Sequence, residues 1–206
     1  MHVIDRTDKF TLVGSDARRG KLTLFGAEGP REQGALEHVA LRVSNLEDAL
    51  SRLPAEVQVE RPREGEAYFD LYERLRLGLV ESPNVQVDYD LDHAALFAPD
   101  PDATARAYER LGFRYSPPGP SGQPRVVVGG AFVDFYPGDP GVPERPLLNH
   151  LAVLVDSAEE HITEAEELGI EIDDVVDAPN TYAVFVFGPE RVRIEYVEHK
   201  PTFSLT

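Results

Sequence analysis

The sequence contains no cysteine among its 206 residues. Without thiols the chain cannot form a disulfide scaffold, a thiolate zinc site or a cysteine nucleophile. It also lacks an apolar run close to the roughly 20 residues that a membrane-spanning helix needs. The first ten residues, MHVIDRTDKF, have neither the basic start nor the apolar stretch of a signal peptide. These absences lead us to expect a cytoplasmic protein.

Positive charge is scarce. The chain has 20 Lys and Arg residues against 37 Asp and Glu residues, which gives a formal net charge of −17. Because contacts with phosphate groups need clustered basic side chains, this balance argues against nucleic acid and against an anionic membrane surface as partners. The apolar fraction of 42% is that of an ordinary globular protein. A small molecule is the partner that we expect.

Three of the six histidines recur in one local pattern. His38, His93 and His150 stand at intervals of 55 and 57 residues, in LEHVAL (36–41), LDHAAL (91–96) and LNHLAV (148–153). Each apolar run is followed by a helical segment and then by two or three β-like runs. In two helical segments, Ser44 with Glu47 and Ser157 with Glu160 have the spacing of a capping box. The chain is therefore a repeat with a period of about 56 residues.

The repeat predicts an α+β fold of tandem βαβββ modules, paired into curved, mostly antiparallel sheets with the helices outside. Complete modules are expected at 35–82, 87–140 and 147–199, and residues 1–29 match the tail of a truncated module. We expect two module pairs, a degenerate one in 1–85 and a C-terminal one in 86–206. The truncated module leaves an open sheet edge, which a homodimer is one way to cover.

The last strands of two modules carry carboxylates between apolar residues. Asp134 lies in FVDFYPGD and Glu195 in VRIEYVE, whereas Gly78 and Thr23 stand at the matching places in the other two units. A carboxylate in such a strand is costly unless it is paired, hydrogen-bonded or bound to a cation. If two modules form one curved sheet, their histidines and carboxylates converge. Two imidazoles and one carboxylate suit non-haem Fe(II), and a second carboxylate also suits Mn, Ni or Zn.

This arrangement resembles the vicinal oxygen chelate superfamily, which includes glyoxalase I, bleomycin-resistance proteins and extradiol ring-cleaving dioxygenases. The resemblance rests on LDHAAL, FVDFYPGD, LNHLAVLVD and FGPERVRIEYVE, and it covers nearly the whole chain. It implies that one divalent metal is bound by His93, His150 and Glu195, with Asp134 as an optional fourth ligand. His38 would then be structural, because Gly78 and Thr23 leave its own module pair without a carboxylate.

The resemblance implies three functions that the sequence leaves open. A ring-cleaving dioxygenase with Fe(II) is favoured, although Phe185 stands where that group carries a tyrosine and Tyr182 is the nearest candidate catalytic tyrosine. The second function is a glyoxalase-like isomerase or lyase, for which Asp134 would supply a further ligand. The third is a metal-free small-molecule-binding protein similar to bleomycin-resistance proteins.

Overall fold

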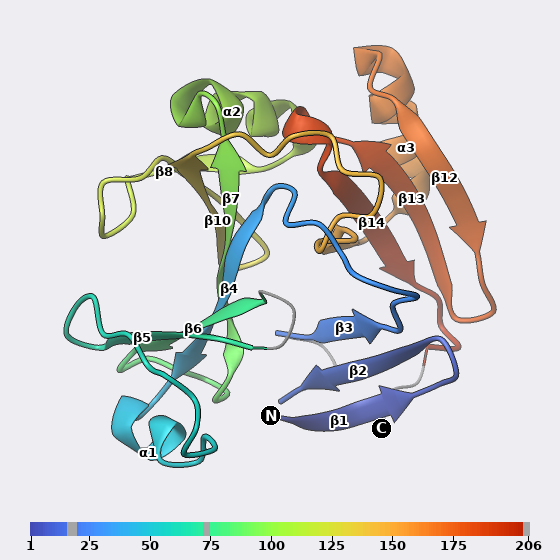
Figure 1. Cartoon of the computed structure of the whole chain (residues 1–206). Coiled ribbons are helices and arrows are strands. Elements are labelled where there is room, and N and C mark those ends of the chain that lie inside the picture. Colours follow the sequence, from blue (N-terminus) through green and yellow to red (C-terminus); the bar gives the residue numbers. More distant parts are fainter. Residues whose placement is uncertain (16–19, 72–74, 204–206) are drawn as a thin grey trace.

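The computed structural model describes residues 1–15, 20–71 and 75–203, and it shows an α+β protein with three β-sheets (Figure 1). The predicted fold class is confirmed. The N-terminal sheet has the strand order β1-β2-β3, with β1 (His2–Arg6), β2 (Phe10–Gly14) and β3 (Leu22–Phe25). A seven-stranded sheet has the order β5-β6-β4-β7-β10-β9-β8. Its strands are β4 (Leu36–Val43), β5 (Glu66–Asp70), β6 (Arg76–Glu81), β7 (Asp90–Ala98), β8 (Arg114–Ser116), β9 (Arg125–Val128) and β10 (Ala131–Pro137).

The third sheet is four-stranded and belongs to the last module. Its order is β11-β14-β13-β12, with β11 (Leu151–Val155), β12 (Ile172–Asp177), β13 (Thr181–Phe187) and β14 (Arg193–His199). Each complete module contributes one α-helix after its first strand: α1 (Leu46–Leu50), α2 (Pro101–Tyr108) and α3 (Ala158–Leu168). Two short 3-10 turns, η2 (Glu109–Leu111) and η3 (Pro189–Arg191), follow α2 and precede β14.

The helices begin at the kind of residue that the sequence predicts. Ser157 caps α3 by accepting a hydrogen bond from the Glu160 backbone amide, as expected. In the first module the cap is Asn45, one residue after the predicted Ser44, because the Asn45 side chain reaches the amide of Asp48. Within the described part of the chain, no helix is long and apolar enough to cross a membrane.

The repeat is visible in the strand register. In every complete module the first strand runs parallel to the last, as in β4–β6, β7–β10 and β11–β14. The alanine two residues after each histidine lies opposite the position where a carboxylate can stand. Its pairs are Ala40 with Gly78, Ala95 with Asp134, and Ala152 with Glu195. The sequence alignment of the modules is therefore correct to the residue at these places.

The pairing between modules differs from the prediction. Strand β4 pairs antiparallel with β7, so modules 35–82 and 87–140 share the seven-stranded sheet. The expectation that modules 87–140 and 147–199 form one curved sheet is wrong, since β11 belongs to a separate sheet. The predicted boundary between residues 85 and 86 falls inside the seven-stranded sheet. The modules are thus nested, with the inner two paired and the outer two units flanking them.

Two linkers explain this nesting. Segments 26–35 and 137–147, both predicted as linkers, run beside each other. The Glu32 amide donates to the Arg145 carbonyl (3.0 Å), and the Leu147 amide donates to the Glu32 carbonyl (2.7 Å). Arg145 also donates to the carbonyl of Glu28. The chain therefore leaves the N-terminal sheet and returns to the four-stranded sheet along one shared path.

The helices pack on the face of each sheet that is opposite the histidines. Tyr108 of α2 is fully buried, and its ring contacts Phe135 of β10 at 5.0 Å between centroids. The same core joins the two halves of the molecule. The Tyr196 hydroxyl of β14 donates to the Leu111 carbonyl (2.7 Å), and the Thr104 hydroxyl of α2 donates to Glu190 (2.9 Å). This core leaves the opposite faces of both sheets free for the histidines.

Candidate functional site

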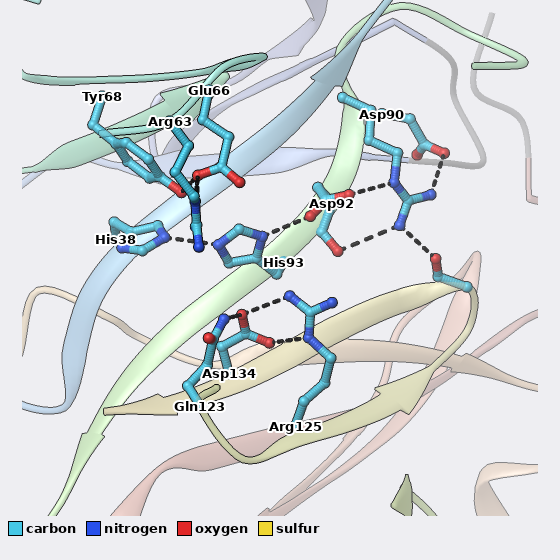
Figure 2. Close-up of polar contacts among 12 residues, drawn as sticks. His38, Arg63, Glu66, Tyr68, Asp90, Asp92, His93, Gln123, Arg125 and Asp134 are labelled. Atoms are coloured by element: carbon cyan, nitrogen blue, oxygen red, sulfur yellow. Dashed lines mark hydrogen bonds and ion pairs between the residues drawn. The ribbon is translucent and has the colours of Figure 1, made fainter. Parts of the chain in front are cut away.

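The centre of the seven-stranded sheet brings His38 and His93 together, because their strands are neighbours (Figure 2). Their Nε2 atoms lie 2.7 Å apart, and each residue is 4% exposed. We call the face of this sheet that carries the two histidines the inner cup. Sequence reasoning treated His38 as structural and placed His93 beside His150 instead.

An acidic residue precedes each histidine of the inner cup and lies at a break in the β4–β7 register. The pairing passes from Leu36 directly to His38, and on β7 from His93 directly to Leu91. Such bulges can turn a side chain toward its neighbour. Asp92 Oδ2 lies 2.6 Å from His93 Nδ1, and the Glu37 carboxylate contacts His38 Nδ1. A carboxylate at Nδ1 keeps the proton on that nitrogen, so Nε2 is the atom left to accept a proton or a metal.

The hydrogen bonds of the inner cup require one extra proton. The three contacts from Glu37 through both rings to Asp92 need three protons, whereas two neutral imidazoles carry two. Burial, with the positive charges of His93 and Arg76, lowers the pKa of His38 from 6.5 to about 3. His38 is therefore neutral at neutral pH. One proton between the two Nε2 atoms is enough to stabilise the contact between His38 and His93.

Asp134 lies on the same face, but its carboxylate is already neutralised. The residue is completely buried, and its oxygens accept from Arg125 Nε (2.5 Å), Arg125 Nη2 (2.7 Å) and Gln123 Nε2 (2.5 Å) (Figure 2). Two parallel bonds from one guanidinium form a strong, directional pair. The buried carboxylate of Asp134, which suggested a metal ligand, is thus stabilised by the Arg125 guanidinium and the Gln123 amide.

In the inner cup, Gly78 stands at the position that matches Asp134, and the ring of Tyr68 fills the space beside it. A Cβ atom on Gly78 would lie 2.6 Å from Cε1 of Tyr68, and the Tyr68 ring also contacts His38 at 4.8 Å between centroids. Beside the histidines lies a cavity of about 130 Å³, whose walls include Arg63, Tyr68, Asp92, His93, Arg125 and Tyr136. The inner cup therefore offers two imidazoles, no free carboxylate and a small polar cavity.

The other two predicted ligands meet in the last module. His150 directly precedes β11, and its Nε2 lies 3.1 Å from Oε2 of Glu195 on β14. The side chains of the two residues are 14% and 18% exposed. We call the face of the four-stranded sheet that carries them the outer cup. Asn149 replaces the acidic residue of the other two modules, and its Oδ1 lies 2.8 Å from His150 Nδ1, so that Nε2 points to Glu195.

Aromatic rings flank this pair. Phe185 of β13 lies edge-on to His150 at 5.5 Å between centroids, and Phe25 of β3 lies at 6.1 Å. The guanidinium of Arg193 stacks on the Phe185 ring at 3.9 Å and pairs with Asp173 (2.6 Å). In contrast to Asp134, Glu195 forms its ion pair with a titratable imidazole, which a metal can replace as a partner.

The predicted metal set of His93, His150, Glu195 and Asp134 is not assembled. The structure divides it into His93 with Asp134 in the inner cup and His150 with Glu195 in the outer cup. Over residues 1–15, 20–71 and 75–203, no group of three or more His, Asp or Glu side chains is placed to hold a metal ion. The physical reason is the nested pairing, which separates β7 from β11.

The candidate catalytic residue Tyr182 lies outside both cups. Tyr182 and Phe185 are three residues apart on β13, so their side chains lie on opposite faces of the sheet. The Tyr182 side chain points to the helix face, where its hydroxyl donates to Glu159 of α3 (3.0 Å). Tyr182 therefore lies away from His150 and Glu195, because a shift of three residues along a strand reverses the face.

Sequence reasoning also missed the residue before each histidine. Glu37, Asp92 and Asn149 all contact Nδ1 of the next residue, and the signal was present in the repeated dipeptides EH, DH and NH. It was passed over because neighbours on a regular strand point to opposite faces. The bulges at Glu37 in β4 and at Asp92 in β7, and the start of β11 after His150, remove that obstacle.

No family model matches the sequence. No curated protein matches it either. Solved structures do match. A protein from Bacillus subtilis subsp. subtilis, provisionally named a dioxygenase, is 19% identical, with 93% of this chain and 73% of that chain covered and a TM-score of 0.72. A mutant of 4-hydroxymandelate synthase from Streptomyces coelicolor is 14% identical over 85% of this chain and 65% of that one, with a TM-score of 0.55.

A lactoylglutathione lyase from Agrobacterium tumefaciens is 20% identical, with 52% of this chain and 91% of that chain covered and a TM-score of 0.40. At these identities the likeness concerns the fold. The chain has the vicinal oxygen chelate fold, as the resemblance implied.

Proposed function

We propose that the chain is a metal-dependent enzyme that holds one divalent cation between His150 and Glu195 in the outer cup. The substrate is a small molecule that chelates the metal through oxygens, and the reaction is of the ring-cleaving dioxygenase class. One observation carries this proposal. An imidazole Nε2 and a carboxylate oxygen lie 3.1 Å apart on one sheet face, a separation at which both can bind the same ion.

The outer cup suits a metal better than the inner cup does. In the inner cup the carboxylate of Asp134 is bound by Arg125 and Gln123, and a proton satisfies the contact between the two rings. In the outer cup Asn149 is neutral, so it orients the imidazole of His150 without adding charge. Glu195 remains available to neutralise a cation. Two protein ligands leave several coordination positions for a substrate.

The residues around the pair define what the protein contributes. A bound divalent metal would supply Lewis-acid chemistry and, for Fe(II), the capacity to activate oxygen. Asn149 Oδ1 contacts His150 Nδ1 and so orients the ring with Nε2 toward Glu195. Phe185 and Phe25 place apolar rings beside the pair, which lowers access of water to this side of the cup. Glu195 can take a proton from a bound hydroxyl group or return it.

The test is metal content measured by mass spectrometry after anaerobic purification without chelator or affinity metal. We expect up to one metal ion per chain, and we expect His150→Ala and Glu195→Gln to lose it. His38→Ala is the matched control, because it removes a histidine from the inner cup and should leave the metal in place. Equal loss in all three variants, or loss only in His38→Ala, would contradict the assignment to the outer cup.

The identity of the metal then separates the two enzymatic classes. Iron, with oxygen uptake in the presence of a catechol, supports the dioxygenase. Nickel, zinc or manganese without oxygen uptake supports a glyoxalase-like isomerase or lyase, because those ions act on carbonyl or enediolate groups without redox change. A protein that binds none of these metals in titrations would instead be a small-molecule-binding protein, with ligands in the inner-cup cavity.

A further inference from the structure

The cavity of the inner cup has a wall that both inner modules build, and neither His150 nor Glu195 belongs to it. Module 35–82 contributes Arg63 and Glu66 to the wall, and module 87–140 contributes Arg125. The cavity has a volume of about 130 Å³. Because an engineered cavity of ~150 Å³ holds one benzene molecule, this space takes a ligand of about six non-hydrogen atoms.

Hydrogen bonds hold the wall in place on two sides. Nη1 of Arg63 donates to the Ser121 hydroxyl (2.7 Å), which joins the segment before β5 to the segment between β8 and β9. Gln123 fixes the second segment, because its Oε1 accepts from the Ser121 amide (2.9 Å) while its Nε2 donates to Asp134 (2.5 Å). A wall that is ordered before a ligand arrives loses less entropy on binding.

Two acidic residues beside the cavity are fully engaged with partners. Oδ1 of Asp92 accepts from Arg42 Nε (2.7 Å), and Oδ2 lies 2.6 Å from His93 Nδ1. Both oxygens of Asp134 accept from Arg125. Residues of the protein thus neutralise these two carboxylates, so a cationic ligand finds no free counter-charge in them.

The two arginines of the wall, in contrast, have N–H groups that no residue uses (Figure 2). Nη1 of Arg125 has no acceptor among the residues that the structure describes, since this side chain binds Asp134 through Nε and Nη2. Nη1 and Nη2 of Arg63 each carry a second N–H beyond the one that binds Ser121 or Glu66. Guanidinium groups with free N–H donors are well suited to recognise a carboxylate.

One carboxylate oxygen at the cavity is also free. Arg63 and Tyr68 donate to Oε2 of Glu66, and Oε1 accepts no hydrogen bond from the described residues. This oxygen is not enclosed, because the Tyr108 hydroxyl is the only enclosed side-chain polar atom without a partner in the described part of the chain. Oε1 therefore opens to the cavity whose wall Glu66 helps to form. It can accept a hydrogen bond from a ligand, but it repels negative charge.

The Tyr136 hydroxyl completes the polar wall. Burial raises the pKa of Tyr136, whereas the charges of Arg63 and Arg125 act to lower it. Both guanidinium groups therefore lie within electrostatic reach of this hydroxyl, which stays protonated and can donate to the same ligand. The cavity thus presents several N–H and O–H donors and one carboxylate acceptor.

We propose that the inner-cup cavity is a binding site for a small hydroxycarboxylate. The carboxylate of the ligand accepts from Arg63 and Arg125, and its hydroxyl group donates to Oε1 of Glu66. A carboxylate without a hydroxyl group leaves this oxygen unpaired, and a phosphate dianion brings a further negative charge beside it. Binding needs no metal, so this inference does not rest on the proposed function of the outer cup.

The experiment is isothermal titration calorimetry of lactate into the full chain with a chelator present. Propionate lacks the hydroxyl group of lactate, and lactamide lacks its negative charge. We expect one lactate per chain, binding of propionate that is about fivefold weaker and binding of lactamide that is about tenfold weaker. Equal binding of lactate and lactamide, equal binding of lactate and phosphate, or no saturable binding of lactate would overturn the proposed ligand class.

Matched arginine variants locate the ligand. Arg63→Gln removes one guanidinium group and should weaken lactate binding about tenfold. Arg61→Gln is the control, because Arg61 pairs with Glu47 and lies outside the cavity, and equal effects of the two variants would overturn the site. If Arg63→Gln does not fold, Tyr136→Phe removes only a hydroxyl group and should weaken binding about fivefold. Binding that is lost in His150→Ala, or that appears only without the chelator, would place lactate in the outer cup and overturn the inference.

Discussion

The ion pair between Asp134 and Arg125 decides whether the inner cup is structural or catalytic, so its removal is the most informative single perturbation. Asp134 is 0% exposed, and the side chain of Arg125 is 11% exposed. Three hydrogen bonds of 2.5, 2.5 and 2.7 Å reach the carboxylate, two of them from the guanidinium. Arg125→Met removes the charge and both of these bonds but keeps most of the apolar stem.

The expected loss of stability in Arg125→Met follows from the interactions that Asp134 keeps. Without the guanidinium, a fully buried carboxylate keeps one bond from Gln123 and loses its counter-charge. Removing one partner of a buried pair costs about 3–5 kcal/mol. A typical domain is stable by only about 5–15 kcal/mol, so Arg125→Met should lose about a fifth of its stability or more. The double variant Asp134→Leu with Arg125→Met removes both charges and should recover most of that loss.

Urea unfolding followed by circular dichroism measures these free energies, and a double-mutant cycle gives the coupling between the two residues. We expect a coupling of at least about 2 kcal/mol, because each single variant leaves a charge without its partner. If Arg125→Met does not fold, the double variant still tests the reasoning, since it should fold and retain its metal. A cost below about 1 kcal/mol for Arg125→Met, together with loss of metal in Asp134→Leu, would show that the carboxylate serves a metal.

Three further results follow from the structure. Because burial, with His93 and Arg76 nearby, lowers the pKa of His38 from 6.5 to about 3, only the unfolded chain takes up a proton there between these values. The free energy of unfolding should thus fall by up to roughly 4 kcal/mol as the pH drops from 6.5 to 3, and urea titrations of His38→Gln should show a smaller fall. Gly78→Ala should cost about 1–3 kcal/mol in thermal unfolding, because its Cβ meets the Tyr68 ring, and adding Tyr68→Leu should restore stability. Tyr196→Phe leaves the Leu111 carbonyl without its buried donor and should cost about 1–2 kcal/mol in urea unfolding.

The sequence alone was sufficient to align the modules with one another. Strand, helix and last strand can be aligned between modules because apolar alternation, capping residues and the recurring histidine all depend on neighbours in the chain. The register of Ala152 with Glu195 and of Ala95 with Asp134 confirms that alignment. The pair of His150 with Glu195 could be found for the same reason, since both residues belong to one module.

The pairing between modules could not be obtained in this way. Strands β4, β7 and β11 have the same pattern, so each is an acceptable neighbour for either of the others. The pairing of β4 with β7 goes together with contacts between distant segments. One example is the contact between Glu32 and Arg145, which holds two linkers together. The role of Asp134 was hidden for a related reason. Its partner Arg125 is nine residues away on β9, and a hairpin between them must form before the pair exists.

Nesting has a consequence for how the two cups relate. The inner cup is closed by two complete modules, yet its carboxylate is paired with Arg125 and its glycine position is filled by Tyr68. The outer cup pairs His150 with Glu195, and its strands belong to two separate sheets that end at β3 and β11. The inner half thus has the uninterrupted sheet, and the outer half has the pair of His150 with Glu195.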